Sequence, residues 1–214
     1  MGESTPIAIT IGRQIGSGGL ELGKRLARRL GFVLVDRQIT SEAARHLGCS
    51  EQDVELRTER VSRFWQSFMR VLAIGPPDSI YAQPRPVPEI PDRDLFELQA
   101  YVIRELAADK DVIVIGHAAF YILRDHPGLI NIYTHASMED RIDRIMRVSK
   151  LADAEQARQV AERTDRERER FIREMAGVIW TDARNYDLCI DTSRIPMEIA
   201  EEMVASLVNV RRAS

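Results

Sequence analysis

The feature that most constrains this chain is a β-branched apolar run that leads through a glycine-rich turn into a helix. Residues 7–11 read Ile-Ala-Ile-Thr-Ile, residues 16–19 read Gly-Ser-Gly-Gly, and apolar residues then recur at helical spacing from Leu20 to Leu30. This order predicts a buried strand, a tight loop and a helix. Glycines let the loop N–H groups turn inward and the helix start adds partial positive charge, which favours a phosphate-binding loop. A turn that only packs the strand against the helix is the alternative.

The Walker pattern GxxxxGK[ST] of phosphate-binding loops is incomplete here. Gly19 stands where the pattern has lysine, and Leu20 stands where it has serine or threonine. A cation must therefore reach the phosphates from elsewhere if this loop supports catalysis. Arg13 lies three residues before Gly16 at the end of the predicted strand, so its long side chain could fold back over the loop. The alternative for Arg13 is a salt bridge to Asp36 at the end of a neighbouring strand.

Composition is typical of a soluble globular protein and argues against nucleic acid and membranes as partners. The chain has 214 residues, 44% hydrophobic and 29% charged, which fits one domain with its own core. The net charge of −3 gives no general attraction to nucleic acid or to anionic membranes. Cys49 and Cys189 match no metal-binding spacing and indicate reduced thiols in a cytoplasmic protein. The sequence shows no signal peptide and no apolar run near the ~20 residues of a membrane helix, so we expect no membrane partner.

Five short β-rich runs alternate with helical segments along the chain. The runs cover residues 7–11, 32–35, 112–115, 129–133 and 186–190, and helices are predicted over 20–30, from 94, over 119–124, from 136 and over 196–209. This alternation predicts an α/β fold with a parallel, doubly wound sheet.

Residues 40–93 interrupt the alternation. Residues 40–75 are predicted to be helical and carry an apolar stripe from Phe64 to Leu72, which is typical of a core or of a homodimer face. Six of the nine prolines follow between Pro76 and Pro91 and predict an extended loop.

A charged pair, Asp36-Arg37, stands at the end of the second β-rich run. Parallel α/β sheets bind ligands outside the carboxyl ends of their strands. In that position Asp36 could hold Mg²⁺ through water and Arg37 could hold a phosphate. A mutual ion pair that closes the loop is the alternative.

Residues 141–173 are rich in arginine. Arg163, Arg166, Arg170 and Arg173 are spaced to share one helix face, and Asp165 and Arg168 share an adjacent one. Alternating charge of this kind often marks a solvated helix with ion pairs between neighbouring turns. A phosphoryl-transfer site, however, needs several guanidinium groups to neutralise its phosphates, and a mobile helical hairpin can close such groups over the reactants.

These stretches together resemble the cytidylate kinase-like family of P-loop nucleoside monophosphate kinases, over most of the chain. The matching motifs, in chain order, are Gly16-Ser17-Gly18-Gly19, Asp36-Arg37, residues 114–119, Glu139-Asp140-Arg141 with Arg144, Asp165-Arg166-Glu167-Arg168, Trp180-Thr181-Asp182 and residues 186–193.

The resemblance implies a P-loop NTPase three-layer fold with a five-stranded parallel sheet. Its core would cover residues 6–39, 94–140 and 177–214, with a helical NMP-binding insert at about 40–93 and a lid at about 141–176. It further implies transfer of the γ-phosphoryl group of ATP, with Mg²⁺, to CMP, dCMP or a similar small acceptor.

The same resemblance, read with the residues above, suggests roles for individual positions. The expected charge-stabilising residues are Arg13, Arg37, Arg166 and Arg170. The expected ATP contacts are Gly16, Ser17, Gly18, Gly19, Leu20 and Arg141, with Arg141 facing the adenine. The expected acceptor contacts are Asp36, Arg37, His117, Asp165 and Arg168, and the expected metal ligand is Asp36.

Two departures from true cytidylate kinases bear on activity. Gly19 replaces the Walker lysine, which concerns catalytic power, and His117-Ala118 stand where true cytidylate kinases have an Arg-Asp pair, which concerns the preference for cytosine. The main alternative is therefore a catalytically weak nucleotide sensor of the same fold. A third hypothesis is an interaction protein that uses the stripe from Phe64 to Leu72 and the proline-rich loop.

Overall fold

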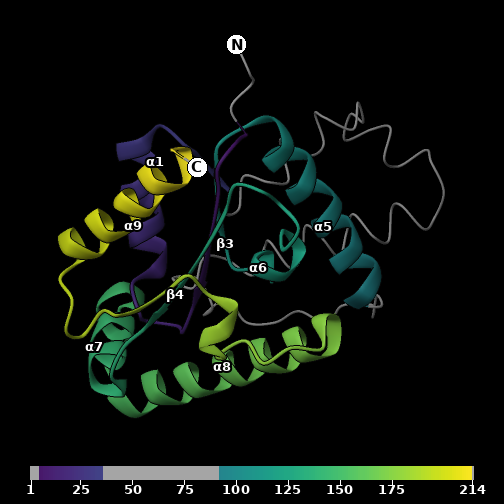
Figure 1. Ribbon diagram of the computed structural model, residues 1–214. Coiled ribbons are helices and arrows are strands. Elements are labelled where there is room, and N and C mark those ends of the chain that lie inside the picture. Colours follow the sequence, from purple (N-terminus) through teal and green to yellow (C-terminus); the bar gives the residue numbers. More distant parts are fainter. Residues whose placement is uncertain (1–4, 36–91, 214) are drawn as a thin grey trace, which may run out of the picture.

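A single parallel sheet forms the centre of the molecule (Figure 1). The computed structural model describes residues 5–35 and 92–213. Its strands are β1 (Ala8–Arg13), β2 (Val33–Val35), β3 (Val112–Ile115), β4 (Leu129–His135) and β5 (Leu188–Asp191). They lie in the order β2-β3-β1-β4-β5, and every pair is parallel, with Ile9 opposite both Ile113 and Ile130. The predicted five-stranded α/β fold is confirmed.

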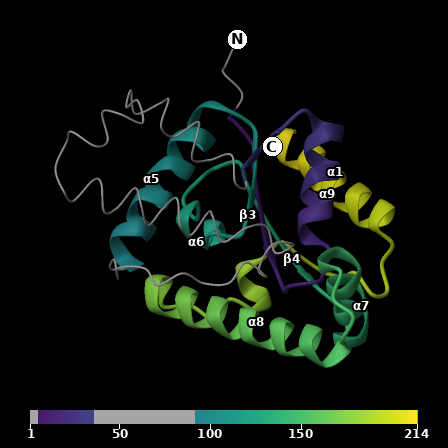
Figure 2. The same cartoon turned by 180° about the vertical axis from the view of Figure 1, so that it is seen from behind.

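Helices cover both faces of this sheet, which makes three layers (Figures 1 and 2). On one face lie α1 (Gly19–Leu30) and α9 (Met197–Arg212), and on the other lie α5 (Asp92–Asp109) and the short α6 (Ala119–Ile122). Because successive strand residues point to opposite faces, β1 feeds both cores. Ile9 and Ile11 pack with Leu22, Leu26 and Val204 under α1 and α9, whereas Ala8 packs on the side of α5 and α6.

A helical hairpin lies beyond the carboxyl ends of the strands. It consists of α7 (Met138–Ser149) and the long α8 (Ala154–Ala176), which runs across that end of the sheet in Figures 1 and 2. Ser137 caps α7 by accepting a hydrogen bond from the N–H of Asp140 (3.2 Å), and Gly177 ends α8 in the left-handed conformation. A separate apolar cluster joins the hairpin to the glycine loop: Ile15 packs with Ile142, Ile145, Ala157 and Ala161.

The boundaries of several elements differ from those expected. β1 and β4 each run two residues further, to Arg13 and His135, because Gly12 pairs with Tyr133 and Arg13 pairs with Thr134. β5 begins at Leu188 rather than at residue 186, since Tyr186 ends a 3₁₀ turn, η2 (Ala183–Asn185). α6 is shorter than expected, and α9 continues to Arg212.

Part of the expected insert lies outside the described residues. That part contains the apolar stripe from Phe64 to Leu72 and the proline-rich loop, and Asp36 and Arg37, which precede the expected insert, lie outside the described residues as well. Among the helices that the structure describes, none combines the length and the apolar character needed to cross a membrane.

Candidate nucleotide-binding site

The glycine loop, residues 14–19, connects β1 to α1 and leaves the start of the helix open. Gly16 (φ 77°) and Gly18 (φ 79°) are in the left-handed region, where glycine is strongly favoured. The N–H of Leu22 bonds to the carbonyl of Gly18 (3.0 Å), and within the described residues no side chain caps the helix. The N–H groups of the first helical residues therefore point outward without an intrahelical acceptor, which is the arrangement that binds anions.

Ser17 stabilises the loop from inside. Its side chain is fully buried, its hydroxyl donates to the carbonyl of Gln14 (2.9 Å), and it shares a hydrogen bond with the hydroxyl of Thr134 (2.8 Å). The hydroxyl of Thr192 donates to the carbonyl of Ser17 (2.8 Å). Ser17 can thus offer a ligand its backbone, whereas its side chain holds the loop to the ends of β4 and β5.

A cavity of about 450 Å³ opens beside the loop. Five cationic side chains line it and one acidic side chain, Glu21, opposes them, so the cavity suits a polyanion. The lining residues are Arg13, Gln14, Ile15, Gly16, Gly18, Gly19, Leu20, Glu21, Lys24, Arg28, Arg144, Ile145, Arg147, Val148 and Ser149.

The α7–α8 hairpin is hydrogen-bonded to the glycine loop at Ile15. Asp165 of α8 accepts a hydrogen bond from the N–H of Ile15 (3.0 Å), and Arg141 of α7 donates from Nε to the carbonyl of the same residue (2.8 Å). Arg141 and Asp165 are also hydrogen-bonded to each other. Burial raises the pKa of the Asp165 carboxyl, and the hydrogen bond from the Ile15 N–H and the charges of Arg141 and Arg168 offset this rise only in part.

Two further arginines bond to backbone at this edge. Arg144 donates to the carbonyls of Gly16 (3.2 Å) and Thr192 (2.7 Å) and to the Thr192 hydroxyl (2.8 Å). Arg168 donates to the carbonyl of Arg13 (3.1 Å) and lies 3.6 Å from Asp165 Oδ1. Hydrogen bonds from charged donors are strong, so these arginines fix the conformation of the loop.

The end of β3 is strained. Gly116, His117 and Ala118 are consecutive residues with positive φ (80°, 57° and 53°), which is uncommon for residues other than glycine. Such strain is typical of functional sites. Burial, together with the charges of Arg13 and Arg168, lowers the pKa of His117 to about 4, so its imidazole is neutral at physiological pH.

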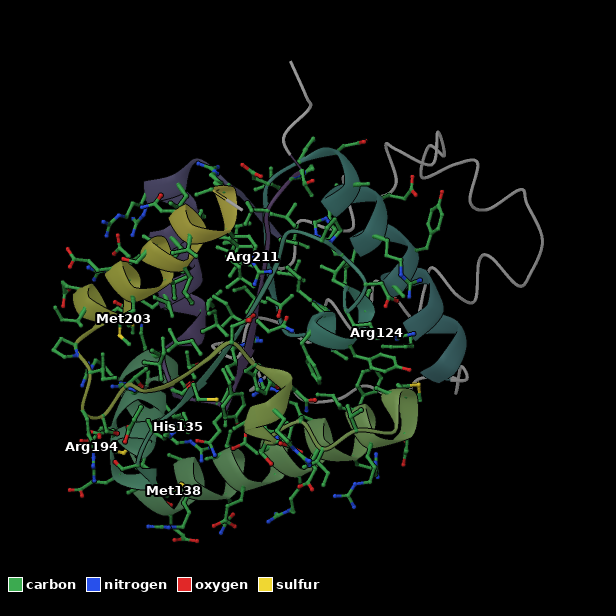
Figure 3. All side chains as sticks on the ribbon, viewed as in Figure 1. Arg124, His135, Met138, Arg194, Met203 and Arg211 are labelled. Carbon is green, nitrogen blue, oxygen red and sulfur yellow. The ribbon has the colours of Figure 1, made fainter. Side chains whose placement is uncertain are left out.

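An aromatic group lies under α8 next to this edge. Tyr133 stacks at an angle on Tyr186 (ring centroids 5.0 Å apart) and edge-to-face on Trp180 (5.8 Å). The buried Tyr133 hydroxyl has no hydrogen-bond partner among the described residues, and burial raises its pKa. The neighbouring His135 and Met138 lie close to where α7 meets α8 (Figure 3). The sequence assigned no individual role to Tyr133, Thr134 or Thr192, although Thr192 lies in the matching motif 186–193 and their place at the ends of β4 and β5 was a usable signal.

The structure brings most of the predicted site residues together. The loop glycines, Leu20 and Arg13 line the cavity. Arg141 is only 4% exposed and lies under the loop, where it bonds to protein atoms. Its expected contact with adenine stays a prediction. Arg166 and Arg170 are 69% and 75% exposed, pair with Glu162 and Glu174 on α8, and do not line the cavity.

The expected metal ligand cannot be placed, since Asp36 and Arg37 lie outside the described residues. In residues 5–35 and 92–213, no group of three or more acidic, histidine or cysteine side chains could hold a metal ion. The side chain of Leu20 has no oxygen to offer one.

Comparison with known proteins identifies the family and supports the fold. The profile of the Cytidylate kinase-like family matches residues 8–194. A cytidylate kinase from Pyrobaculum aerophilum is 28% identical over 196 residues, which cover 91% of this chain and 88% of the relative. The crystal structure of an uncharacterized protein from Eubacterium ventriosum superposes with a TM-score of 0.68 at 21% identity, covering 95% of this chain and 98% of that one. A gluconokinase from Sinorhizobium meliloti gives a TM-score of 0.53 at 16% identity, with 99% and 97% covered, and so shares the kinase fold. The chain belongs to the Cytidylate kinase-like family.

Proposed function

We propose that the protein is an ATP-dependent phosphotransferase whose acceptor is a nucleoside monophosphate, such as CMP or dCMP, or a similar small molecule. The observation that carries this proposal is the uncapped start of α1, which opens into a cavity with five cationic side chains. The relative from Pyrobaculum aerophilum, a cytidylate kinase, supports a nucleotide as the acceptor.

In this proposal the donor and the acceptor use different parts of the site. The N–H groups of Gly16, Gly18, Gly19 and Leu20 bind the β-phosphate of ATP. Arg168, which lies near His117 at the edge of the sheet, and its ion-pair partner Asp165 contact the acceptor. Asp36 would help to hold Mg²⁺, directly or through water, and the ion would neutralise charge on the ATP phosphates. The cytoplasmic location stays a prediction, as do a homodimer and the absence of nucleic-acid partners.

His117 gives the acceptor pocket a different chemistry from the Arg-Asp pair of true cytidylate kinases. A neutral imidazole offers one donor and one acceptor and no charge. It can therefore recognise a base edge or a hydroxyl, whereas an Arg-Asp pair carries fixed charges. For this reason the proposal includes acceptors other than CMP.

Product formation from a panel of acceptors tests the proposal. Purified protein is incubated with ATP–Mg²⁺ and each of CMP, dCMP, UMP, AMP, GMP, shikimate and gluconate, and ADP and phosphorylated product are quantified. We expect transfer to at least one nucleoside monophosphate above the rate of ATP hydrolysis without acceptor. Transfer to none of the panel would contradict the proposal.

A second candidate is a nucleotide sensor with weak turnover. It is favoured by Gly19 in the lysine position and by the commitment of Arg141, Arg144 and Arg168 to protein atoms. ATP binding without transfer to any acceptor in the panel would support it.

A further inference from the structure

We propose that Arg13 replaces the missing Walker lysine as a catalytic residue. We further propose that position 19 is a glycine because the aliphatic part of the Arg13 side chain occupies the space that a side chain at position 19 would need. This inference rests on the proposed phosphotransfer and names the group that stabilises charge in it.

The surroundings of Gly19 carry the first part of the argument. A Cβ atom added to Gly19 would lie 2.9 Å from Cβ and 3.1 Å from Cδ of Arg13, and 2.7 Å from Oγ1 of Thr134. These distances are shorter than ordinary contacts between such atoms. Gly19 is the first residue of α1, where a Walker lysine would start, so the packing of Arg13 leaves no room for that lysine.

The guanidinium group of Arg13 extends to the neighbouring strand end. A Cβ atom on Gly116 would lie 2.6 Å from Arg13 Nη1, so the guanidinium lies directly over Gly116 at the end of β3. The stem thus passes the uncapped start of α1, and Arg13 lines the cavity there. A phosphate on the α1 N–H groups would therefore meet the Arg13 side chain.

The backbone holds Arg13 in this position before any ligand binds. Arg13 is the last residue of β1, pairs with Thr134 of β4, and its carbonyl accepts a hydrogen bond from Arg168 (3.1 Å). A cation fixed in advance stabilises developing charge without reorganisation at the moment of reaction.

The chemical role follows from where charge moves. An oxygen of the acceptor forms a bond to the γ-phosphorus while the bond from that phosphorus to the bridging oxygen breaks, and its electron pair stays on the β-phosphate of ADP. The negative charge therefore grows on the bridging oxygen, while the transferring phosphoryl group keeps its charge spread over its three other oxygens. The Arg13 guanidinium donates hydrogen bonds to these oxygens and transfers no proton.

The test compares Arg13→Ala, Arg13→Lys and the matched control Arg29→Ala. Arg29 is an arginine of α1, the helix that follows the glycine loop, but it pairs with Glu201 of α9 (3.3 Å) and does not line the cavity. With ATP–Mg²⁺ and the best acceptor of the panel, we expect Arg13→Ala to lower kcat by roughly 100-fold while the Kd for ATP changes much less. Arg13→Lys should lie between, since a lysine keeps the charge but not the planar fork. Added guanidinium ion at concentrations below those that unfold the protein should restore part of the turnover of Arg13→Ala, and urea should not.

A second measurement keeps the inference independent of the acceptor. ADP–aluminium fluoride mimics the transferring phosphoryl group, and calorimetry compares its binding with that of ADP. We expect Arg13→Ala to weaken the fluoride complex at least tenfold more than ADP, even if the wild-type protein phosphorylates no acceptor tested and the proposed function fails. Full turnover of a folded Arg13→Ala protein would overturn the inference, as would equal weakening of both complexes or a wild-type protein that does not bind the fluoride complex.

Discussion

Two sets of arginines in the α7–α8 hairpin differ in what they contact. The inner set, Arg141, Arg144 and Arg168, donates hydrogen bonds to backbone carbonyls of Arg13, Ile15, Gly16 and Thr192. The outer set, Arg166, Arg170 and Arg173, is exposed and pairs with glutamates one turn away on α8. The inner set fixes the glycine loop, whereas exposed pairs of the outer kind contribute little to stability. The same residue type thus builds a site on one side of the hairpin and a solvated surface on the other.

Removing the inner carboxylate gives the largest expected effect. Asp165→Asn leaves Arg141 buried without its charged partner and weakens the hydrogen bond to Ile15. We expect the free energy of unfolding to fall by about 3–5 kcal/mol, measured by urea denaturation. The matched outer change, Glu169→Gln, removes the exposed partner of Arg173 and should cost about 0.5 kcal/mol or less. Equal losses in the two variants would show that the two sets do not differ.

The pH dependence of stability tests the surroundings of His117, which include Arg168 of the inner set. Because burial, with smaller effects from the charges of Arg13 and Arg168, lowers the pKa of His117 to about 4, its neutral form is favoured in the folded protein. The unfolded chain takes up the proton first as pH falls, so His117 contributes its stability above about pH 6.5 and loses it between pH 6.5 and 4, up to about 3 kcal/mol. His117→Asn tolerates the left-handed backbone and should flatten this part of the curve in denaturation at several pH values. Parallel curves for the two proteins would contradict the assignment.

Nucleotide binding tests whether the loop held by the inner set binds phosphate. ATP–Mg²⁺ at 100 times its Kd should stabilise the protein by about 2.7 kcal/mol, seen as a rise in Tm. Gly18→Ala should reduce this rise, since its Cβ would lie 2.8 Å from Cε of Met197 and the loop must shift to relieve that contact. Gly31→Ala is the matched control, because Gly31 has a similar φ (72°) at the far end of α1 and its added Cβ would meet nothing within 4 Å. A normal ATP-induced rise in a folded Gly18→Ala protein would place the nucleotide elsewhere.

The smallest expected effect is on acceptor binding. It tests whether the inner and outer arginines differ in function. Arg168→Ala should weaken acceptor binding by about 1.5–3 kcal/mol through loss of a charged hydrogen bond, while ATP binding changes little. Arg173→Ala, an outer arginine, should leave both affinities as they are. Calorimetric titration with ATP and with the acceptor measures each. If Arg168→Ala weakens ATP binding alone, Arg168 serves the donor rather than the acceptor.

The parts of the fold that local pattern determines were predictable from the sequence. The β-branched runs give five parallel strands, and Gly31 ends α1 in the left-handed conformation, as its place after Leu30 indicates. Strand ends were less predictable because they depend on pairing: β4 reaches His135 only because β1 reaches Arg13 beside it.

Site residues were predictable by type but not by role. The spacing of arginines on α8 does not reveal which of them meet backbone, since that depends on Ile15 and Arg13, more than 100 residues away in sequence. The reason for glycine at position 19 is likewise visible only once Arg13 packs against it. Tyr133 was missed because an apolar run conceals a buried hydroxyl.

The hydrogen bonds to Ile15 couple the movement of the α7–α8 hairpin to that of the glycine loop. Both polar groups of this one residue are bonded to the hairpin, the N–H to Asp165 and the carbonyl to Arg141. The hairpin therefore cannot lift away while the glycine loop keeps all its hydrogen bonds. The amide hydrogen of Ile15 becomes open to solvent only when Asp165 leaves it, so its rate of exchange with deuterium reports how often the hairpin and the loop separate.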